Sequence, residues 1–336
     1  MTTIKDISKV AGVSVTTVSR ALNGYSDVNE ETRKKIIEVA KQLNYSPNTL
    51  ARGLVMKKSQ TIGLLVSGMN RESVKDNLTF QVLSGINECV SVRDYDLILF
   101  NTDSSRQREK TYTQLCRERK VDGAIIQGIK LDDPYLKEVM ESDIPCVLVD
   151  IPVETNTVGY VTTDNVLGAK KAVEHLIELG HRNIAMVNGS DQAFVSKQRL
   201  KGYEKALKEN EIKVQRNWIA DGEFKEEKAK EAVSSLLSSF PEISAIFCAS
   251  DLMALGALKA CQEKGLAVPN DISIIGYDDI LLASYVTPPL TTINQDMFEM
   301  GYEAADLLIN MLEGKAKKRH RILETQLVQR KSCARI

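Results

Sequence analysis

The amino-acid sequence predicts an α + α/β protein, in which a small N-terminal domain of three helices precedes a large domain of two doubly wound parallel sheets. Two observations support this prediction. Residues 1–46 contain short helical periodicities separated by capping residues, whereas the chain from residue 62 onward alternates short apolar strands with amphipathic helices. The alternation passes through two similar units, roughly 62–160 and 162–290, which indicates two lobes with a cleft at the carboxyl ends of their strands.

The first helix is expected to begin after Thr3, with Asp6 in its first turn. Gly12 is expected to end this helix, because only glycine adopts a left-handed conformation there at low cost. The side chains that share one face, and are therefore expected in the core, are Ile7, Val10 and Ala11.

A second helix is expected from Val15 to Asn23, capped by Ser14, and a third over residues 29–43. Two short helices joined by a Gly-Val-Ser turn are typical of a helix-turn-helix. The outer face of the second helix carries groups that suit base edges and phosphates in a major groove, namely Thr16, Thr17, Ser19, Arg20 and Asn23. A small helical bundle without a ligand has the same pattern, so the pattern alone leaves both interpretations open.

The charge of the chain is unevenly distributed. Residues 1–60 contain ten Lys and Arg against five Asp and Glu, a net of +5, and the remainder has a net of −6. A basic head on an acidic body suits a small module that binds a polyanion. The six cysteines are widely scattered and include no C-x-x-C pair, so neither a zinc site nor a redox dithiol is expected, and no metal or cofactor is predicted.

A family resemblance covers essentially the whole chain. Residues 4–24, IKDISKVAGVSVTTVSRALNG, resemble the opening of the lactose/galactose repressor (LacI/GalR) family, and the similarity continues without a gap through residues 43–48 and 51–54. In the large domain it includes residues 180–185, 199–203 and 250–256. The resemblance implies a helix-turn-helix followed by a bilobed periplasmic-binding-protein-like sensor.

The resemblance also implies roles for individual residues of the N-terminal domain and of the segment that follows it. Val15, Thr16 and Arg20 match the positions that contact base edges. The positions that match phosphate contacts are Thr3, Thr17, Ser19, Asn23 and Asn48. Residues 47–55 match a hinge helix that orders on the operator, and Leu54 matches the leucine that enters the minor groove. A helix of about two turns is too short to persist alone, so DNA and a second subunit would have to stabilise it. The alternative is that residues 46–60 are only a linker.

The large domain is predicted to bind a ligand rather than to catalyse a reaction. The first strand is not followed by G-x-G-x-x-G, and the chain contains no P-loop, no G-x-S-x-G and no H-E-x-x-H. His181 is interpreted as a structural residue at a helix end. The strands expected here are 62–66, 97–100, 124–127, 146–149, 184–187, 245–248 and 273–276. The helices expected here are 80–92, 166–179, 199–209, 226–237, 252–264 and 298–312.

Polar groups at strand ends are the candidate ligand contacts, since an α/β cleft places them there. By this argument, and by the resemblance, the candidates are Ser67, Asp150, Ser250 and Asp278. The resemblance adds Arg199 as the effector arginine, with Phe224 and Met297 as apolar walls. For each, a purely structural role is the alternative, and Asp279 is expected to cap a loop. Many relatives have Asn-Pro-Phe-Phe where this chain has residues 76–79, DNLT, so we expect one aromatic wall to be absent.

The resulting hypothesis is a cytoplasmic repressor that binds an inverted-repeat operator as a homodimer and responds to a small molecule. Induction by a sugar is favoured, and corepression is left open. No membrane association is expected, and a second protein partner of the sensor is left open. The alternatives are a transport solute-binding protein and an enzyme with a nucleotide cofactor. The expected domains are 1–46 (helix-turn-helix), 47–60 (hinge helix and linker) and 61–336 (effector binding and dimerisation), with an N-lobe of about 61–161 and 293–321 and a C-lobe of about 162–290 and 322–332.

Overall fold

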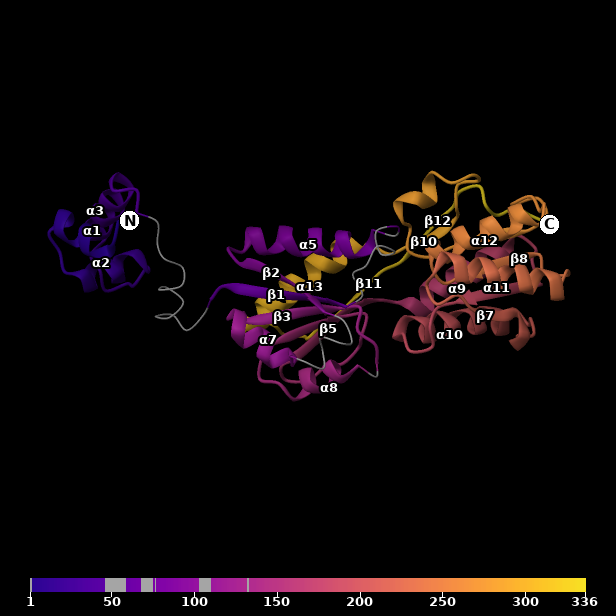
Figure 1. The fold of residues 1–336 in the computed structure, drawn as a ribbon, viewed down its shortest axis with the longest axis horizontal. Helices are drawn as coiled ribbons and strands as arrows, with labels where there is room; N and C mark the ends of the chain where they lie inside the picture. Colours follow the sequence, from indigo (N-terminus) through magenta and orange to yellow (C-terminus); the bar gives the residue numbers. More distant parts are fainter. Residues whose placement is uncertain (1, 46–58, 68–74, 76, 103–109, 132) are drawn as a thin grey trace. The chain divides into compact units, whose positions relative to one another are not determined.

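The computed structural model describes the chain except residues 1, 46–58, 68–74, 76, 103–109 and 132. It divides into two compact units, Met1–Gln60 and Thr61–Ile336 (Figure 1). The predicted hinge helix at 47–55, with Asn48 and Leu54, lies outside the described residues.

The first unit consists of α1 (Ile4–Ala11), α2 (Val15–Leu22) and α3 (Glu30–Gln42), as the sequence predicts. The Thr3 backbone N–H donates to the Asp6 carboxylate at 2.9 Å. Gly12 ends α1 in a left-handed conformation, with φ of 70°. The Thr17 backbone N–H donates to the Ser14 hydroxyl at 3.0 Å, which caps α2. These caps satisfy helix-end groups that would otherwise lack partners.

The core of this unit joins all three helices around Ile7, Val18 and Ile36, none of which is exposed. The prediction that Val10 faces this core is wrong, because its side chain is 58% exposed. Val10 lies about 60° around the helix from Ile7, on the side away from Ala11. A helix of eight residues buries only a narrow stripe, and that stripe passes through Ile7 and Ala11.

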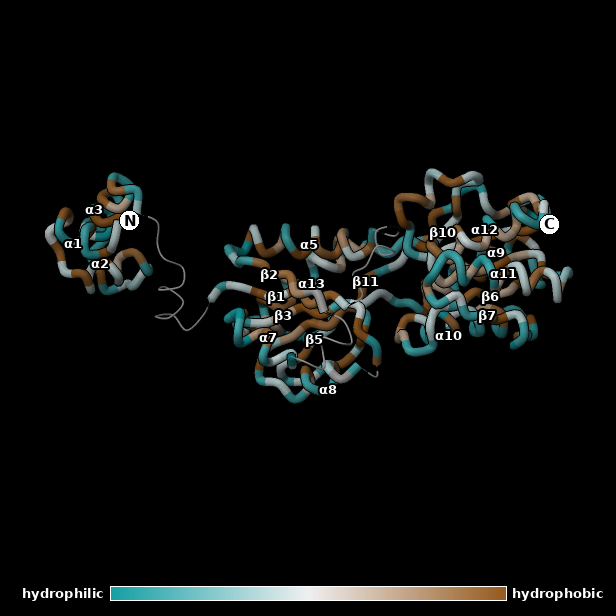
Figure 2. Tube along the Cα trace, viewed as in Figure 1, coloured by the Kyte–Doolittle hydropathy of each residue, from teal (hydrophilic) through white to brown (hydrophobic). Residues whose placement is uncertain are grey.

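The N-lobe of the second unit is a parallel sheet in the order β11-β5-β4-β3-β1-β2. Its strands are β1 (Thr61–Ser67), β2 (Asp96–Thr102), β3 (Gly123–Gln127), β4 (Cys146–Val149), β5 (Val158–Thr163) and β11 (His320–Leu323). One face packs against α5 (Leu78–Val92) and α13 (Met297–Leu312), and the other against α7 (Tyr112–Arg119) and α8 (Pro134–Glu141). The sheet is therefore doubly wound, and Figure 2 shows its hydrophobic stretches along the strands.

The C-lobe contains a second parallel sheet, in the order β7-β6-β8-β9. Its strands are β6 (Ile184–Asn188), β7 (Ile219–Asp221), β8 (Ala245–Cys248) and β9 (Ser273–Ile275). Its helices are α9 (Asn165–Glu178), α10 (Phe194–Glu209), α11 (Glu226–Ser239) and α12 (Asp251–Glu263), with the short helices η2 (Arg216–Trp218) and η3 (Leu281–Ser284). An antiparallel pair, β10 (Thr292–Asn294) and β12 (Gln326–Val328), continues beside β9 through bridges at Ile275 and Asp278.

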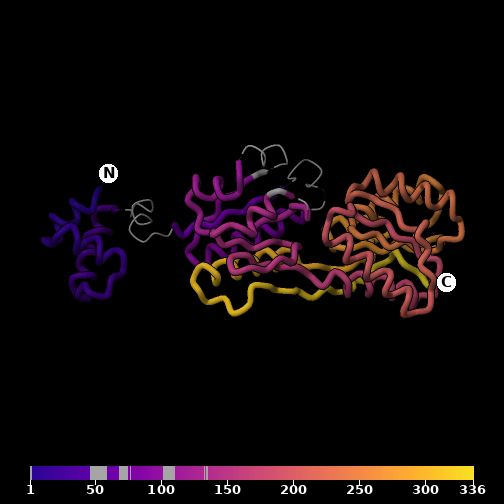
Figure 3. Tube along the Cα trace, turned by 90° about the horizontal axis from the view of Figure 1, so that it is seen from below, coloured from indigo at the N-terminus to yellow at the C-terminus, as the bar shows by residue number. Residues whose placement is uncertain are grey.

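The chain passes between the lobes after Thr163, before Met297 and after Leu323 (Figure 3). The strands β5 and β11 thus extend two residues beyond the expected lobe boundaries at 161 and 321. These crossings meet at the carboxyl ends of the N-lobe strands, which is the edge where a ligand cleft is expected.

His181 is buried and holds the last residues of the chain against the C-lobe sheet. Its Nδ1 lies 2.9 Å from the Ser244 hydroxyl, and its Nε2 lies 3.1 Å from the carbonyl oxygen of Ala334. A neutral ring with the proton on Nε2 satisfies both contacts. The structural role expected for His181 agrees with this geometry, and burial lowers the pKa of His181.

The lowered pKa of His181 predicts that acidic pH destabilises the C-lobe. The unfolded chain binds a proton at His181 with an ordinary pKa of about 6.5, whereas the folded chain binds it more weakly. The free energy of unfolding is therefore expected to fall as the pH drops through about 6.5. Urea denaturation of the wild type and of His181→Gln between pH 7.5 and 5.5 measures this effect. Equal pH slopes for the two proteins would assign the effect to other groups, of which His175 is the first to test because its pKa is also lowered by burial.

Candidate functional site

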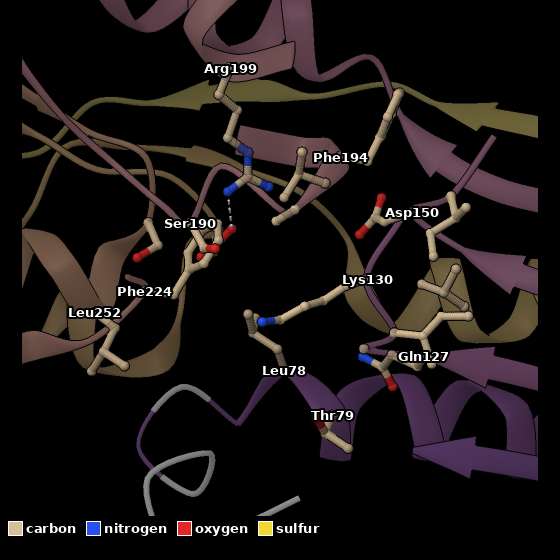
Figure 4. Close-up of a pocket in the computed structure, with 18 of the residues that line it drawn as sticks. Leu78, Thr79, Gln127, Lys130, Asp150, Ser190, Phe194, Arg199, Phe224 and Leu252 are labelled. Carbon is tan, nitrogen blue, oxygen red and sulfur yellow. Dashed lines mark hydrogen bonds and ion pairs between the residues drawn. The ribbon is translucent and has the colours of Figure 1, made fainter. Parts of the chain in front are cut away.

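A cavity of about 690 Å³ lies between the two lobes of the second unit. The N-lobe contributes strand-end residues and the start of α5, and the C-lobe contributes α10 and the loops after β6, β7, β8 and β9. Of the candidates from the sequence, those that line the cavity are Asp150, Arg199, Phe224, Ser250, Asp278 and Met297. Ser67 is not among the lining residues; it ends β1, where it pairs with Thr102. Figure 4 shows Arg199 and Asp150 facing the cavity from the two lobes.

Arg199 is almost completely buried in the wall of the cavity, with 2% of its surface exposed. Its Nε donates to the Asn165 side-chain oxygen at 2.9 Å, and its Nη1 donates to the carbonyl oxygen of Ala249 at 2.6 Å. The guanidinium carbon lies 3.8 Å from the ring centre of Tyr277. Both the direction and the plane of the guanidinium are therefore set before any ligand enters.

Asp278 is the ionic partner of Arg199, with 3.3 Å between Oδ1 and Nη1. The Gln295 amide also donates to this oxygen, at 2.7 Å. Asp278 has a φ of 112°, a conformation that costs free energy and that surrounding contacts must maintain. Its backbone N–H donates to the carbonyl oxygen of Ile293 at 2.8 Å. The position of the carboxylate is thus fixed from both the backbone and the side chain.

Asp150 follows β4 with a left-handed φ of 62°. The Thr162 hydroxyl donates to its Oδ1 at 2.7 Å. Burial raises the pKa of Asp150, while the Thr162 hydrogen bond and the positive charge of Arg199 act in the opposite direction. A carboxylate held in this way can accept hydrogen bonds from ligand hydroxyl groups.

The remaining predicted contacts have structural roles as well. The Ser250 hydroxyl accepts a hydrogen bond from the Met253 backbone N–H at 3.2 Å and so caps α12. Met297 is the buried first residue of α13. The ring of Phe224 lies over Gly189, where an added β-carbon would be 2.1 Å from the ring carbon Cζ. A larger residue at position 189 would therefore require the Phe224 ring to shift.

Several lining residues were not among the sequence candidates, notably Gln127, Lys130, Phe194 and Gln295. Gln127 is the last residue of β3, so the strand-end argument could have found it, and its buried Oε1 accepts no hydrogen bond within the described part of the chain. The Lys130 ammonium reaches across the cavity to the Gln192 side-chain oxygen at 2.6 Å. Leu78 and Thr79 line the cavity where the sequence predicts the loss of an aromatic wall, and Phe194 supplies an aromatic side chain from α10.

The first unit presents the other predicted surface. On α2, Val15, Thr16 and Arg20 are exposed. Their partly buried neighbours are Thr17, Ser19 and Asn23, while Thr3 is exposed at the start of α1. The Asn23 side-chain N–H donates to the Ser19 hydroxyl at 3.4 Å.

One contact on this surface was not predicted. Asp27, in the turn before α3, accepts two hydrogen-bonded contacts from Arg20, with Nε to Oδ1 at 3.1 Å and Nη2 to Oδ2 at 2.6 Å. The Arg20 guanidinium carbon also lies 4.8 Å from the ring centre of Tyr25. The guanidinium is thus oriented before it meets any partner.

Comparison with known proteins identifies both units. Residues 3–48 match the family described as bacterial regulatory proteins, lacI family, and residues 173–333 match a periplasmic binding protein-like domain. The chain is 36% identical to the HTH-type transcriptional repressor PurR of Photobacterium profundum over 99% of this chain and 98% of that protein. The chain belongs to the lacI family.

Solved structures of the lacI family agree with this assignment. The lac repressor dimer bound to operator and an anti-inducer superposes with a TM-score of 0.82 at 30% identity, covering 99% of each chain. The transcriptional regulator CelR in complex with cellobiose superposes with a TM-score of 0.76 at 30% identity, covering 99% of this chain and all of that one. This member of the lacI family is a DNA-binding transcriptional repressor. Its similarity to repressors confirms the predicted fold and the prediction that the chain is not an enzyme.

Within the ranges that the structure covers, no helix is long and apolar enough to cross a membrane. Over the same residues, no cluster of three or more His, Cys, Asp or Glu side chains is arranged to hold a metal ion.

The buried pair at the cavity predicts a large loss of stability in Arg199→Ala. Removal of one partner leaves the Asp278 carboxylate buried without its ionic partner, which costs about 3–5 kcal/mol. Urea denaturation measures this change. The control is Arg216→Ala, which breaks an exposed pair with Glu204 and is expected to cost less than about 1 kcal/mol. Similar losses of unfolding free energy in the two variants would show that burial of the Arg199–Asp278 pair does not increase the cost of breaking it.

Proposed function

We propose that this repressor is a homodimer that binds an inverted-repeat operator and is controlled by a sugar-like effector in the cavity between its lobes. The observation that carries the proposal is the hydrogen-bond network of Arg199 and Asp278. Both residues line the cavity, and both are bonded to segments where the chain crosses between lobes. Arg199 holds Asn165, just after the first crossing, and Asp278 holds Gln295, just before the second.

A ligand that contacts this network would act directly on the lobe crossings. The Gln295 side-chain oxygen accepts a hydrogen bond from the Thr163 hydroxyl at 3.1 Å, which connects the two crossings to each other. In the proposed mechanism, effector binding changes the relation of the lobes and, in a dimer, the separation of the two hinge segments. The effector can change the affinity for DNA by no more than the factor by which its own affinity differs between the DNA-binding arrangement of the lobes and the other arrangement.

The chemistry of the cavity favours a sugar. Asp150 and Asp278 are carboxylates that accept hydrogen bonds, and Arg199 donates them, so neighbouring hydroxyl groups could be bound from both sides. Phe224 and Met297 supply apolar walls, which suit the C–H face of a sugar ring. The regulator CelR, solved with cellobiose, supports this choice of ligand class.

Exposed apolar side chains support a second copy of the chain as the partner. On the N-lobe, Phe80 and Val92 of α5 and Leu99 of the edge strand β2 are exposed. On the C-lobe, η3 exposes Leu281, and the following Tyr285 is 76% exposed. We infer that these side chains contribute to an interface between two copies of the chain, and a two-fold dimer matches the symmetry of an inverted repeat. Sedimentation of the full-length protein as a monomer at micromolar concentration would contradict this proposal.

DNA contacts follow the helix-turn-helix. We infer that Val15, Thr16 and Arg20 contact base edges, that Thr3, Thr17, Ser19, Asn23 and Asn48 contact phosphates, and that Leu54 enters the minor groove. The exposure of Val15, Thr16 and Arg20 on one helix supports the first part of this inference.

Arg20→Ala is expected to reduce sequence-specific affinity by about 1–3 kcal/mol, because one charge-assisted contact to a base is lost. The measurement compares binding to a duplex selected by the protein from a random pool with binding to a scrambled duplex of the same composition, at one salt concentration. Lys34→Ala, which removes an equal charge from α3, is expected to weaken binding to both duplexes alike. An unchanged ratio in Arg20→Ala would exclude base contact by Arg20.

Asp278→Asn is expected to bind the selected duplex within about twofold of wild type and to lose the effector response, because a carboxylate of the cavity is replaced by an amide. A thermal-shift panel of sugars, sugar phosphates and nucleobases first finds a stabilising compound, since a bound ligand raises the apparent stability. Asp279→Asn is the matched control, because the neighbouring Asp279 pairs with Arg330 and does not line the cavity. A full thermal shift in Asp278→Asn would remove Asp278 from the effector site.

A further inference from the structure

The contact between Arg20 and Asp27 uses one particular edge of the guanidinium. Nε faces Oδ1 at 3.1 Å and Nη2 faces Oδ2 at 2.6 Å, so the carboxylate occupies the side edge of the group. A guanidinium has five N–H donors in a rigid plane. The side edge takes two of them, which leaves both hydrogens of Nη1 and the outer hydrogen of Nη2. The outer hydrogens of Nη1 and Nη2 form the end edge, and an arginine can donate through this pair of nitrogens to O6 and N7 of guanine.

Tyr25 restricts the remaining motion of the group. Its ring centre lies 4.8 Å from the guanidinium carbon, which covers one face of the plane. Tyr25 is itself held by the backbone, because its N–H donates to the carbonyl oxygen of Arg20 at 3.1 Å. Its own carbonyl oxygen accepts a hydrogen bond from Arg33 Nη2 at 2.6 Å. Val28 is buried directly after Asp27 and anchors the turn to the core.

Stability does not account for this arrangement. The side chains of Arg20 and Asp27 are 45% and 54% exposed, and ion pairs at such positions contribute little to folding. A carboxylate on a face that meets phosphates also repels the DNA. Asp27 therefore reduces general attraction to DNA unless it improves the fit of Arg20 to one base.

We propose that Asp27 is a positioning residue for specificity, which holds Arg20 so that its end edge is presented to a guanine in the operator. This inference rests on the proposed contact of Arg20 with a base edge. It predicts that the acid in the turn, and not only the arginine on the recognition helix, determines the preference for guanine. The side chain of Asp27 acts through Arg20 and needs no contact with the DNA.

The test uses the full-length protein and duplexes selected from a random pool by the wild type. Asp27→Ala is expected to bind the selected duplex about tenfold more weakly and a scrambled duplex slightly more tightly, since a negative charge is removed. Its discrimination between guanine and the other bases at one position of each half-site is expected to fall by a similar factor. Asp27→Asn, which keeps one acceptor oxygen, is expected to fall between Asp27→Ala and wild type. The matched control, Glu38→Gln, removes the same charge from α3 and is expected to leave guanine discrimination unchanged.

The double variant Arg20→Ala/Asp27→Ala separates this inference from the proposed function. If Asp27 acts through Arg20, then Asp27→Ala has no further effect on discrimination when Arg20 is absent. An equal effect in both backgrounds, or unchanged guanine discrimination in Asp27→Ala, overturns the inference while Arg20 keeps its role. Unchanged discrimination in Arg20→Ala alone overturns the proposed base contact instead. Thermal unfolding of each variant within about 3 °C of wild type shows that folding does not cause the change.

Discussion

The buried ion pair between Arg199 and Asp278 is the interaction on which the structure of the cavity between the lobes depends. It connects α10, the loop after β9 and, through Asn165 and Gln295, two of the segments that join the lobes. Two buried charges are stable only when their hydrogen-bonding groups find partners, and here Ala249, Asn165 and Gln295 provide them. The same contacts that make burial of the pair tolerable also connect the cavity to the lobe crossings.

The two arginines of interest in this chain are oriented by opposite means. Arg199 is enclosed, so its direction is set by contacts on nearly every side and by the ring of Tyr277. Arg20 is exposed, and its orientation relies on one carboxylate and one aromatic face. In water such a surface pair is weak, and it strengthens as water is excluded. Exclusion of water by a bound duplex would therefore strengthen an orientation of Arg20 that Asp27 and Tyr25 already define in the free protein.

Much of the fold could be predicted because strong periodicity reflects burial. The strand β6 and the helix α9, for example, lie within one residue of their predicted bounds. The first turn of α10 was missed because Ala193 offers no capping side chain, and with it Phe194 escaped notice as a cavity residue. The short helices α7 and α8 were missed, as was β5, where a glycine and two threonines dilute the apolar pattern.

The site was predictable where position along the chain implies position in space. Strand ends lie at one edge of each parallel sheet, and the cleft lies between the two edges. Asp150 of the N-lobe could therefore be brought together with Ser250 and Asp278 of the C-lobe from the sequence alone. No such rule relates Asp27 to Arg20, because the two residues are seven positions apart and a turn lies between them. Their contact depends on the path of the backbone, which caps and periodicity do not specify.

The packing of Phe224 on Gly189 has an evolutionary consequence. A β-carbon at position 189 would overlap the ring, so a larger residue at 189 requires the ring to move or residue 224 to become smaller, whereas a smaller residue at 224 creates no overlap. Descendants that reshape this wall can therefore lose the large ring at 224 first and gain a side chain at 189 afterwards, whereas the opposite order forces an overlap. Across a lineage, residues larger than glycine at 189 are therefore expected mainly where residue 224 is small.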